Sequence, residues 1–184
     1  MSTTSTPLRP ARALASEDGE ARWFLGSLAT VKLTGADTEG QFSLVEMVGA
    51  KGDMPPLHVH HTDDETFLLI EGELSFYVGG QVLRGEPGSM LFAPRGIPHA
   101  YRVESETARW RVISSPPAFP EFLLEASVPA KTRTLPSEPP TITPDQLTEI
   151  ASRYGIEVLG PPGTIPIAPT WRFEEGSHDL AFDG

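Results

Sequence analysis

Three histidines and one glutamate have the types and spacing of a metal site. His58 and His60 are two residues apart, so on a β-strand both side chains leave the same face. Glu65 lies at an odd offset, which points the wrong way on one continuous strand, but residues 62–64 (Thr-Asp-Asp) favour a turn that restarts the alternation. His99 follows a Pro-x-Gly turn and begins another alternating stretch. A lone histidine on a strand is usually structural, but the clustering of these four indicates a metal centre.

The donor set limits the metal and its chemistry. Four nitrogen and oxygen donors without sulfur suit a six-coordinate divalent ion such as Fe, Mn, Ni or Co, with one or two open positions, and suit Zn less well. Such a metal can polarise a substrate oxygen, bind dioxygen or activate water. Glu65 is the only carboxylate of the set, which makes it the predicted catalytic general base as well as a ligand.

Aromatic and apolar residues close to the ligands predict the walls of a substrate pocket. The predicted substrate-binding side chains are Phe67, Met90, Phe92 and Tyr101. Phe76 and Trp110 are interpreted as barrel core, and His61 is expected to point outward because its parity is opposite to that of His60. An apolar, aromatic cavity beside a metal favours a flat aromatic or polyketide-like substrate over a sugar or a small dicarboxylate.

The two ligand-bearing stretches resemble the paired motifs of the cupin superfamily. The first, Gly-x5-His-x-His-x4-Glu-x6-Gly, is matched by Gly52, His58, His60, Glu65 and Gly72. The second, Gly-x5-Pro-x-Gly-x2-His-x3-Asn, is matched by Gly88, Pro94, Gly96 and His99, whereas Val103 stands at the Asn position. That Asn is not a ligand in the family, so its absence bears on the end of the strand and not on the metal.

The resemblance covers roughly residues 23–128 and implies an all-β fold, a small double-stranded β-helix (jelly-roll) barrel. Within the superfamily, the chain looks most like the bacterial monocupin quercetin 2,3-dioxygenases, because it has one motif pair and a helical C-terminal appendage. In those enzymes the matching glutamate is both ligand and base, and the resemblance implies the same for Glu65. It also implies dioxygen as a co-substrate.

The rest of the chain supplies the short strands that such a site needs. Alternating aromatic, β-branched and small residues predict strands near 23–33, 42–48, 73–78, 89–93 and 108–114. Glycine and proline turns separate them, and Gly79-Gly80 is typical of a two-residue hairpin. A barrel of such strands can bring together ligands that are distant in the sequence.

Composition divides the chain into four segments. Residues 1–20 are expected to form a flexible arm, 21–128 the cupin barrel, 129–143 a proline-rich linker, and 144–184 a C-terminal helix and tail. The helix begins with a capping box at Thr143–Gln146 and carries one apolar stripe, which predicts that it docks at the barrel mouth or on a partner subunit. His178, in the polar tail, is not expected to be a ligand.

Charge and composition exclude several function classes. The 184 residues contain 14 Lys and Arg against 25 Asp and Glu, a net charge of −11, which disfavours nucleic acid and anionic membranes as partners. There is no cysteine, no secretory-type apolar segment and no membrane-spanning run, so a cytoplasmic protein is expected. Exposed edge strands of a small barrel favour a homodimer.

Three functions stay open from the sequence. The first is oxidative ring cleavage of a flavonol-like or other aromatic enol substrate. The second is a non-oxidative polyketide cyclase or isomerase. The third is a cupin that binds a ligand without turnover. An intact ligand set with open metal positions favours an enzyme, since pure binding has no need of them.

Overall fold

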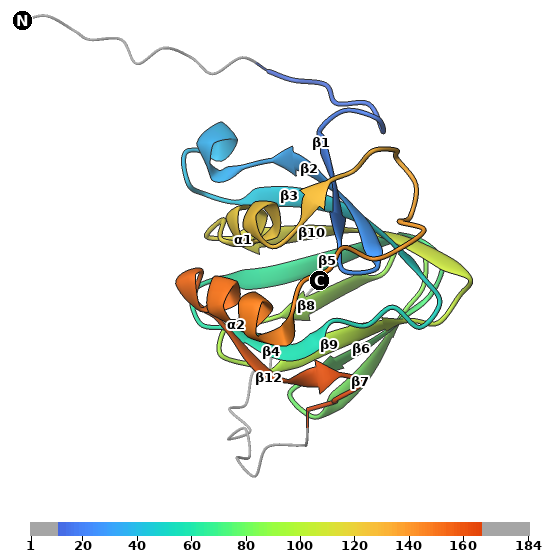
Figure 1. The fold of residues 1–184 in the computed structure, drawn as a ribbon, viewed down its shortest axis with the longest axis vertical. Coiled ribbons are helices and arrows are strands. Elements are labelled where there is room, and N and C mark those ends of the chain that lie inside the picture. The colour runs from blue at the N-terminus through green and yellow to red at the C-terminus, as the bar shows by residue number, and fades with distance from the viewer. Residues whose placement is uncertain (1–10, 167–184) are drawn as a thin grey trace, which may run out of the picture.

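Residues 11–166 are described by the structure, a computed structural model, and they form two antiparallel β-sheets with two short α-helices (Figure 1). The first seven elements are β1 (Glu20–Phe24), β2 (Ser27–Leu33), the 3-10 turn η1 (Gly35–Thr38), β3 (Ser43–Ala50), β4 (Pro56–His60), β5 (Asp64–Glu71) and β6 (Leu74–Val78). The other eight are β7 (Gln81–Gly85), β8 (Met90–Ala93), β9 (His99–Val103), β10 (Thr107–Ser115), α1 (Phe119–Glu125), β11 (Val128–Pro129), α2 (Pro144–Arg153) and β12 (Ile156–Pro162).

The strands are divided between a seven-stranded and a five-stranded sheet, as in a jelly-roll barrel. The strand orders are β11-β1-β2-β3-β10-β5-β8 and β12-β4-β9-β6-β7. The core lies between the two sheets and includes Trp110 and Phe76, both fully buried as predicted. The predicted fold class, an all-β cupin-type barrel with a short C-terminal helix, is confirmed.

The predicted turns fall at the expected positions around the motifs. β4 ends at His60 and β5 begins at Asp64, so the turn at residues 61–63 does restart the alternation before Glu65. Gly79 and Gly80 have φ of 53° and 80°, which is the backbone of a hairpin turn that side chains disfavour. The first turn passes the chain from β4 in the five-stranded sheet to β5 in the seven-stranded sheet, and the second joins β6 to β7 within the five-stranded sheet.

One turn near the N-terminus was not anticipated. The stretch 23–33 was expected to be one strand, but it is split into β1 and β2 by a tight turn at Leu25 and Gly26. Leu25 has φ of 52°, a left-handed conformation that is uncommon for a leucine and that no composition signal announces. The turn places Leu25 against the core.

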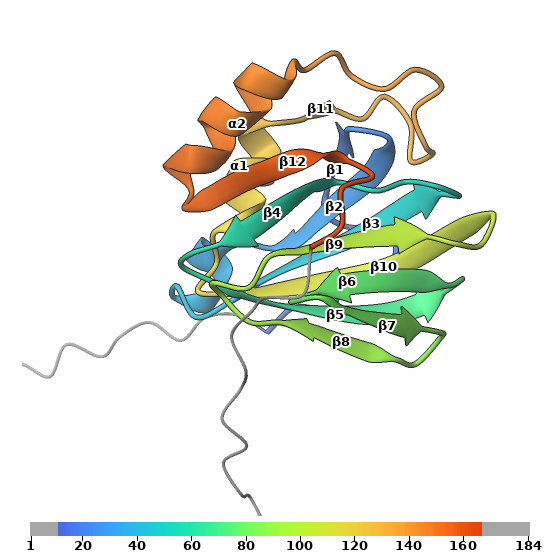
Figure 2. The same ribbon diagram turned by 90° about the horizontal axis from the view of Figure 1, so that it is seen from below.

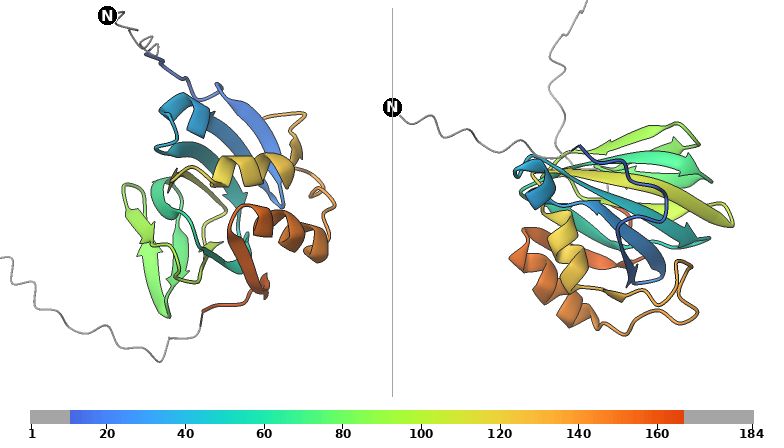
Figure 3. Two further views of the ribbon diagram at one scale, coloured as in Figure 1. Left: turned by 90° about the vertical axis from the view of Figure 1, so that its left-hand side faces the viewer. Right: turned by 90° about the horizontal axis from the view of Figure 1, so that it is seen from above.

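Two helices lie next to each other at one side of the barrel (Figures 2 and 3). α2 begins with the predicted capping box: the Thr143 hydroxyl accepts from the Gln146 N–H, and the Gln146 side chain accepts from the Thr143 N–H. α1 was missed, because a helix of seven residues that includes Pro120 is too short for a helical pattern to stand out. Leu147 and Ala151 of α2 are buried against the barrel side.

β12 was not predicted, because its sequence is rich in glycine and proline. It follows α2 and pairs antiparallel with β4, with Ile156 opposite His60 and Val158 opposite His58. The expected barrel boundary at residue 128 leaves this strand outside, whereas it is the edge strand of the five-stranded sheet. The C-terminal segment therefore supports the strand that carries two of the predicted ligands.

Part of the sequence falls outside the described residues. This applies to residues 1–10 of the expected arm and to residues 167–184, which include His178. Residues 11–19 carry no regular structure, and the Lys32 ammonium donates to the main-chain oxygens of Ala15, Ser16 and Asp18. Within residues 11–166 no helix is long and apolar enough to cross a membrane.

Two substitutions on β12 test whether this strand belongs to the folded barrel. Ile156 is 4% exposed and Leu159 is 43% exposed. We expect Ile156→Ala to lower the free energy of unfolding by about 2–4 kcal/mol, because it removes buried methyl groups and leaves a cavity. Leu159→Ala, the matched control, should change it by less than about 0.5 kcal/mol. Urea unfolding measures both, and equal effects would contradict the placement of β12.

Candidate metal centre

Four side chains from three strands meet inside the barrel. His58 and His60 come from β4, Glu65 from β5 and His99 from β9, and their donor atoms all lie within 4.8 Å of one another. His60, Glu65 and His99 are each at most 2% exposed, whereas His58 is partly exposed. His58 and His99 are direct cross-strand neighbours. The structure therefore brings together the whole predicted ligand set.

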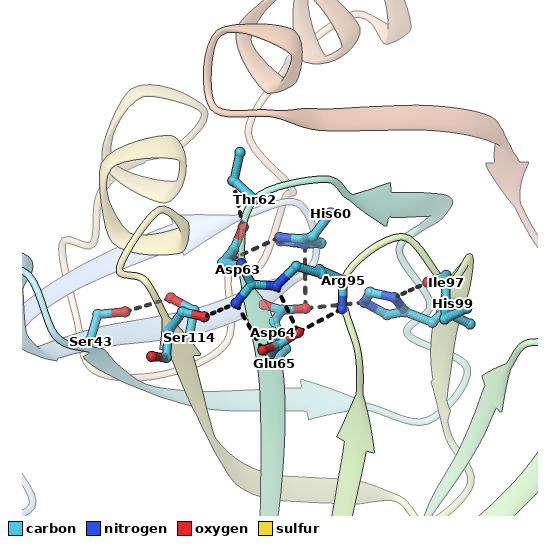
Figure 4. A network of polar contacts seen from close by, with 11 residues as sticks. Ser43, His60, Thr62, Asp63, Asp64, Glu65, Arg95, Ile97, His99 and Ser114 are labelled. Carbon is cyan, nitrogen blue, oxygen red and sulfur yellow. Dashed lines mark hydrogen bonds and ion pairs between the residues drawn. The ribbon is translucent and has the colours of Figure 1, made fainter. Parts of the chain in front are cut away.

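The three imidazole rings are held by hydrogen bonds at their outer nitrogens. The Nδ1 of His58 lies 2.8 Å from the Pro56 oxygen, and the Nδ1 of His99 lies 3.1 Å from the Ile97 oxygen. A carbonyl oxygen can only accept, so both Nδ1 atoms carry the proton. The Nδ1 of His60 donates to the Asp63 carboxylate at 3.0 Å (Figure 4). This arrangement fixes each ring and leaves Nε2 for the interior.

The atoms facing the interior fit a cation. The Glu65 Oε2 lies 3.1 Å from the Nε2 of His99 and 3.3 Å from the Nε2 of His60 (Figure 4). Since Nδ1 already carries the proton, a neutral ring offers only a lone pair at Nε2. Lone pairs on nitrogen and on a carboxylate repel one another at these distances unless a proton or a metal ion lies between them. The donor set therefore suits a divalent metal.

The close packing of this cluster shifts the pKa values of three of its side chains. Burial, followed by the positive charges of its histidine neighbours, lowers the pKa of His58 to about 3. Burial alone would lower the pKa of His60, but the Glu65 and Asp63 carboxylates outweigh it and raise the pKa. Burial alone would raise the pKa of Glu65, but the three imidazoles lower it to about 2. Glu65 is thus a carboxylate at neutral pH, as a ligand must be.

Polar contacts outside the cluster hold the start of β5. Asp64 accepts from the Arg95 main-chain N–H at 2.8 Å and from its guanidinium at 2.9 Å (Figure 4). The same guanidinium donates to the Ser115 oxygen on β10 at 3.3 Å. Arg95 lies in the turn between β8 and β9, so these contacts tie the β5 strand that carries Glu65 to the turn before His99. His61 points outward to Glu157, as predicted.

An apolar cavity of about 60 Å³ lies beside the cluster. Three of the four ligands line it, namely His58, His60 and Glu65. This volume is far below the roughly 300 Å³ of a typical small-molecule pocket. A two-ring substrate can therefore enter only if part of the wall moves outward.

Two of the predicted substrate-binding residues line this cavity and two do not. Phe67 and Tyr101 are in its wall. The prediction is wrong for Met90 and Phe92, which are 67% and 49% exposed. On β8 the inward positions belong to Leu91 and Ala93, because Ala93 pairs with Glu65 and Leu91 with Phe67, and paired residues share a face.

Sequence reasoning missed most of the cavity roof. It consists of apolar residues from outside the motif region: Phe24, Leu25, Phe119, Phe122, Leu147, Ala151, Ile156 and Val158. The apolar stripe of α2 was a usable signal for Leu147 and Ala151, whose expected docking near the barrel mouth agrees with this position. Trp110, interpreted as core, is fully buried and also lines the cavity.

Tyr101 carries the hydroxyl group of the cavity wall. Burial raises its pKa well above the ordinary value of 10.0, the Asp53 carboxylate raises it further, and hydrogen bonding with Ser27 acts in the opposite direction. The phenol thus keeps its proton at neutral pH.

Comparison with known proteins agrees with this architecture. Residues 45–114, which contain all four candidate ligands, match the family described as Cupin domain. Quercetin 2,3-dioxygenase of Bacillus subtilis is 29% identical over 125 residues, which is 68% of this chain and 37% of the relative. An uncharacterised protein of Streptomyces coelicolor is 32% identical over 57 residues, 31% of this chain and 54% of the relative. The chain thus spans 37% and 54% of the lengths of these curated relatives.

Solved structures share the fold at low sequence identity. A predicted oxalate decarboxylase of Thermotoga maritima has a TM-score of 0.54 at 14% identity and covers 56% of this chain and 98% of its own. A polyketide cyclase of Streptomyces resistomycificus has a TM-score of 0.51 at 17% identity and covers 78% of this chain and 94% of its own. The paired motifs, the two-sheet barrel and the family match agree that residues 45–114 carry a cupin domain.

Proposed function

We propose that this protein is a metal-dependent cupin dioxygenase that acts on a flavonol-like or other aromatic enol substrate. The observation that carries the proposal is the position of the His58, His60, Glu65 and His99 cluster, which is buried and opens onto an apolar, aromatic cavity. His58, partly exposed at the cavity side, marks where a substrate would approach.

The four residues would hold one divalent ion, with Fe, Mn, Ni or Co preferred to Zn by the nitrogen and oxygen donor set. When bound, such an ion supplies Lewis acidity toward a substrate oxygen and redox chemistry toward dioxygen. The hydrogen bonds from Nδ1 to Pro56, Asp63 and Ile97 would keep the three rings aligned for it.

Glu65 would take the proton of the substrate hydroxyl. It is the only carboxylate in the cluster, and its low pKa keeps it ionised and ready to accept. The same imidazoles that lower this pKa weaken Glu65 as a base, so proton transfer requires the carboxylate to move partly off the cluster. The proton passes from the substrate oxygen to a Glu65 oxygen, and the substrate becomes an electron-rich enolate.

The cavity wall would then protect that enolate. Apart from the three ligands, the lining side chains are apolar or aromatic, so water is excluded from the reacting atoms. No Lys or Arg is among them, which disfavours a dicarboxylate such as oxalate. Because the cavity is small, α1 and α2 in its roof would have to shift for a substrate to enter.

The named relatives support the proposed class of reaction. The Bacillus subtilis relative is named a quercetin 2,3-dioxygenase. The alternative is a non-oxidative polyketide cyclase or isomerase, since the structural neighbour from Streptomyces resistomycificus is a polyketide cyclase that aligns with 78% of this chain, more than the barrel alone. A cupin that binds a ligand without turnover is the third possibility, and the experiments below separate the three.

The metal assignment predicts a specific loss on mutation. His99→Ala removes a buried donor, so metal-loaded protein should retain well below one metal equivalent per chain after dialysis. His61→Ala is the matched control, because His61 is exposed and paired with Glu157 outside the cluster, and it should keep a full equivalent. Elemental analysis measures both, and a full equivalent in His99→Ala would show that the ligand set is wrong.

The dioxygenase assignment predicts oxygen uptake with quercetin in protein loaded separately with Fe, Mn, Ni and Co. Glu65→Gln should lower the rate at least about 100-fold, since it removes the proton acceptor. Glu71→Gln, on the same strand but exposed, should leave the rate unchanged. Metal content is measured on the same samples. Turnover without oxygen loss would favour the cyclase or isomerase, and binding of quercetin without turnover the binding cupin.

We also propose a homodimer formed through the free edge of β8. Among the strands of residues 11–166, β8 pairs with β5 alone, and it presents the exposed apolar side chains of Met90 and Phe92. Unpaired edges with apolar side chains favour strand association. This edge would be self-complementary in a two-fold dimer in which the two β8 strands run antiparallel.

The proposed dimer predicts that one charged substitution on β8 lowers the molar mass in solution to that of a monomer. Light scattering at micromolar concentration should give twice the mass of the chain for the wild type and the monomer mass for Phe92→Lys. Val128→Lys, at an exposed position on the other edge strand of the same sheet, serves as the control and should stay dimeric. A monomeric wild type would contradict the proposal.

A further inference from the structure

His60 differs from the other two candidate histidine ligands in the group that lies behind its ring. The Nδ1 atoms of His58 and His99 each donate to a main-chain carbonyl oxygen two residues earlier, at 2.8 and 3.1 Å. The Nδ1 of His60 instead donates to a carboxylate, the Oδ2 of Asp63, at 3.0 Å. A carbonyl oxygen is neutral and a carboxylate is charged, so the hydrogen bond of His60 is the strongest of the three.

Asp63 is as deeply buried as the candidate ligands. It is 1% exposed, and its side chain is 0% exposed. Within residues 11–166 no Lys or Arg forms an ion pair with it, since Arg95 in the following turn pairs with the partly exposed Asp64. A buried carboxylate without a positive charge beside it is strongly unfavourable. The position of Asp63 therefore requires a cation close by.

Two buried carboxylates thus enclose one imidazole (Figure 4). The Nε2 of His60 lies 3.3 Å from the Oε2 of Glu65, and its Nδ1 lies 3.0 Å from the Oδ2 of Asp63. With neutral imidazoles, the centre carries two negative charges and no positive one, and a divalent ion would bring the sum to zero. A carboxylate behind an imidazole also makes the opposite nitrogen a stronger donor to a metal.

The turn that carries Asp63 is held in place by the C-terminal part of the chain. Gly155, between α2 and β12, has φ of 70°, and its oxygen accepts from the His61 N–H at 2.8 Å. A Cβ at this position would lie 2.9 Å from the Cγ2 of Thr62, so only glycine packs this closely. The Thr62 hydroxyl donates to the Oδ1 of Asp63 at 3.1 Å. Both oxygens of Asp63 therefore accept a hydrogen bond.

We propose that Asp63 is a positioning residue of the candidate metal centre, which orients the His60 ring and supplies the second negative charge that a divalent ion balances. His60 is then the strongest nitrogen donor of the three. This inference rests on the metal site of the proposed function. It holds for each of the reactions considered above, because it involves neither substrate nor dioxygen.

The first test measures the affinity of the full chain for Co²⁺ by competition with a coloured chelator. Asp63→Asn removes the charge but keeps an oxygen that can accept from His60, and it should bind Co²⁺ at least about ten-fold more weakly. Asp53→Asn is the matched control. Asp53 is also partly buried and accepts from the Ser27 hydroxyl, but it takes part in none of the imidazole hydrogen bonds, so its substitution should leave the affinity unchanged.

The second test observes the three Nδ1 protons by NMR in protein loaded with Zn²⁺, which is diamagnetic. A stronger hydrogen bond moves the proton resonance downfield, so the His60 proton of the wild type should be the furthest downfield of the three. In Asp63→Asn it should move toward the other two, while the resonances of His58 and His99 stay in place. A merely structural role of Asp63 would shift all three.

The outcomes separate this inference from the metal assignment. A wild type that binds no Co²⁺ overturns the metal site and this inference with it. Equal Co²⁺ affinity of the wild type and Asp63→Asn overturns this inference alone, and so does a shift of all three proton resonances in the variant. If Asp63→Asn does not fold, the wild-type spectrum decides, because a His60 proton upfield of either other proton contradicts the inference. Weaker binding with a selective shift of the His60 proton supports it.

Discussion

Three imidazoles that donate their outer protons to fixed oxygens are the constraint on which the rest of this structure depends. Each hydrogen bond from Nδ1 leaves a lone pair on the opposite nitrogen, and the three lone pairs are gathered around one carboxylate. Concentrating donors in this way is unfavourable without a cation. Only a rigid frame holds them together, and the two sheets of the barrel, with their strands in fixed register, provide it.

The ligand set could be predicted from the sequence because the patterns that indicate it are local. Strand alternation, the turn that contains Thr62 and Asp63, and the Pro-x-Gly turn before His99 each act over a few residues, and the structure has all three. The acceptors for His58 and His99 are also local, since each ring bonds to the main chain two residues earlier. Asp63, beside His60, was treated only as part of a turn.

The cavity lining was harder to predict from the sequence, because it depends on the register between strands that are distant in the chain. The turn between β8 and β9 breaks the alternation of inward and outward side chains, so the inward positions of β8 cannot be counted back from His99. For this reason Met90 and Phe92 were wrongly placed inside. The roof comes from both ends of the chain, outside residues 45–114 that match the family. The ligands and the roof of the cavity are thus specified by different parts of the sequence, which allows the roof to change while the ligands stay.

The pairing of β4 sets the order in which the chain can fold. β4 meets β9 at a single residue pair but meets β12 at five, and β12 follows it by about 100 residues. During synthesis the strand that bears His58 and His60 must therefore wait, one edge open, until the last part of the barrel has left the ribosome. The centre is completed late, by a segment that contributes no ligand to it.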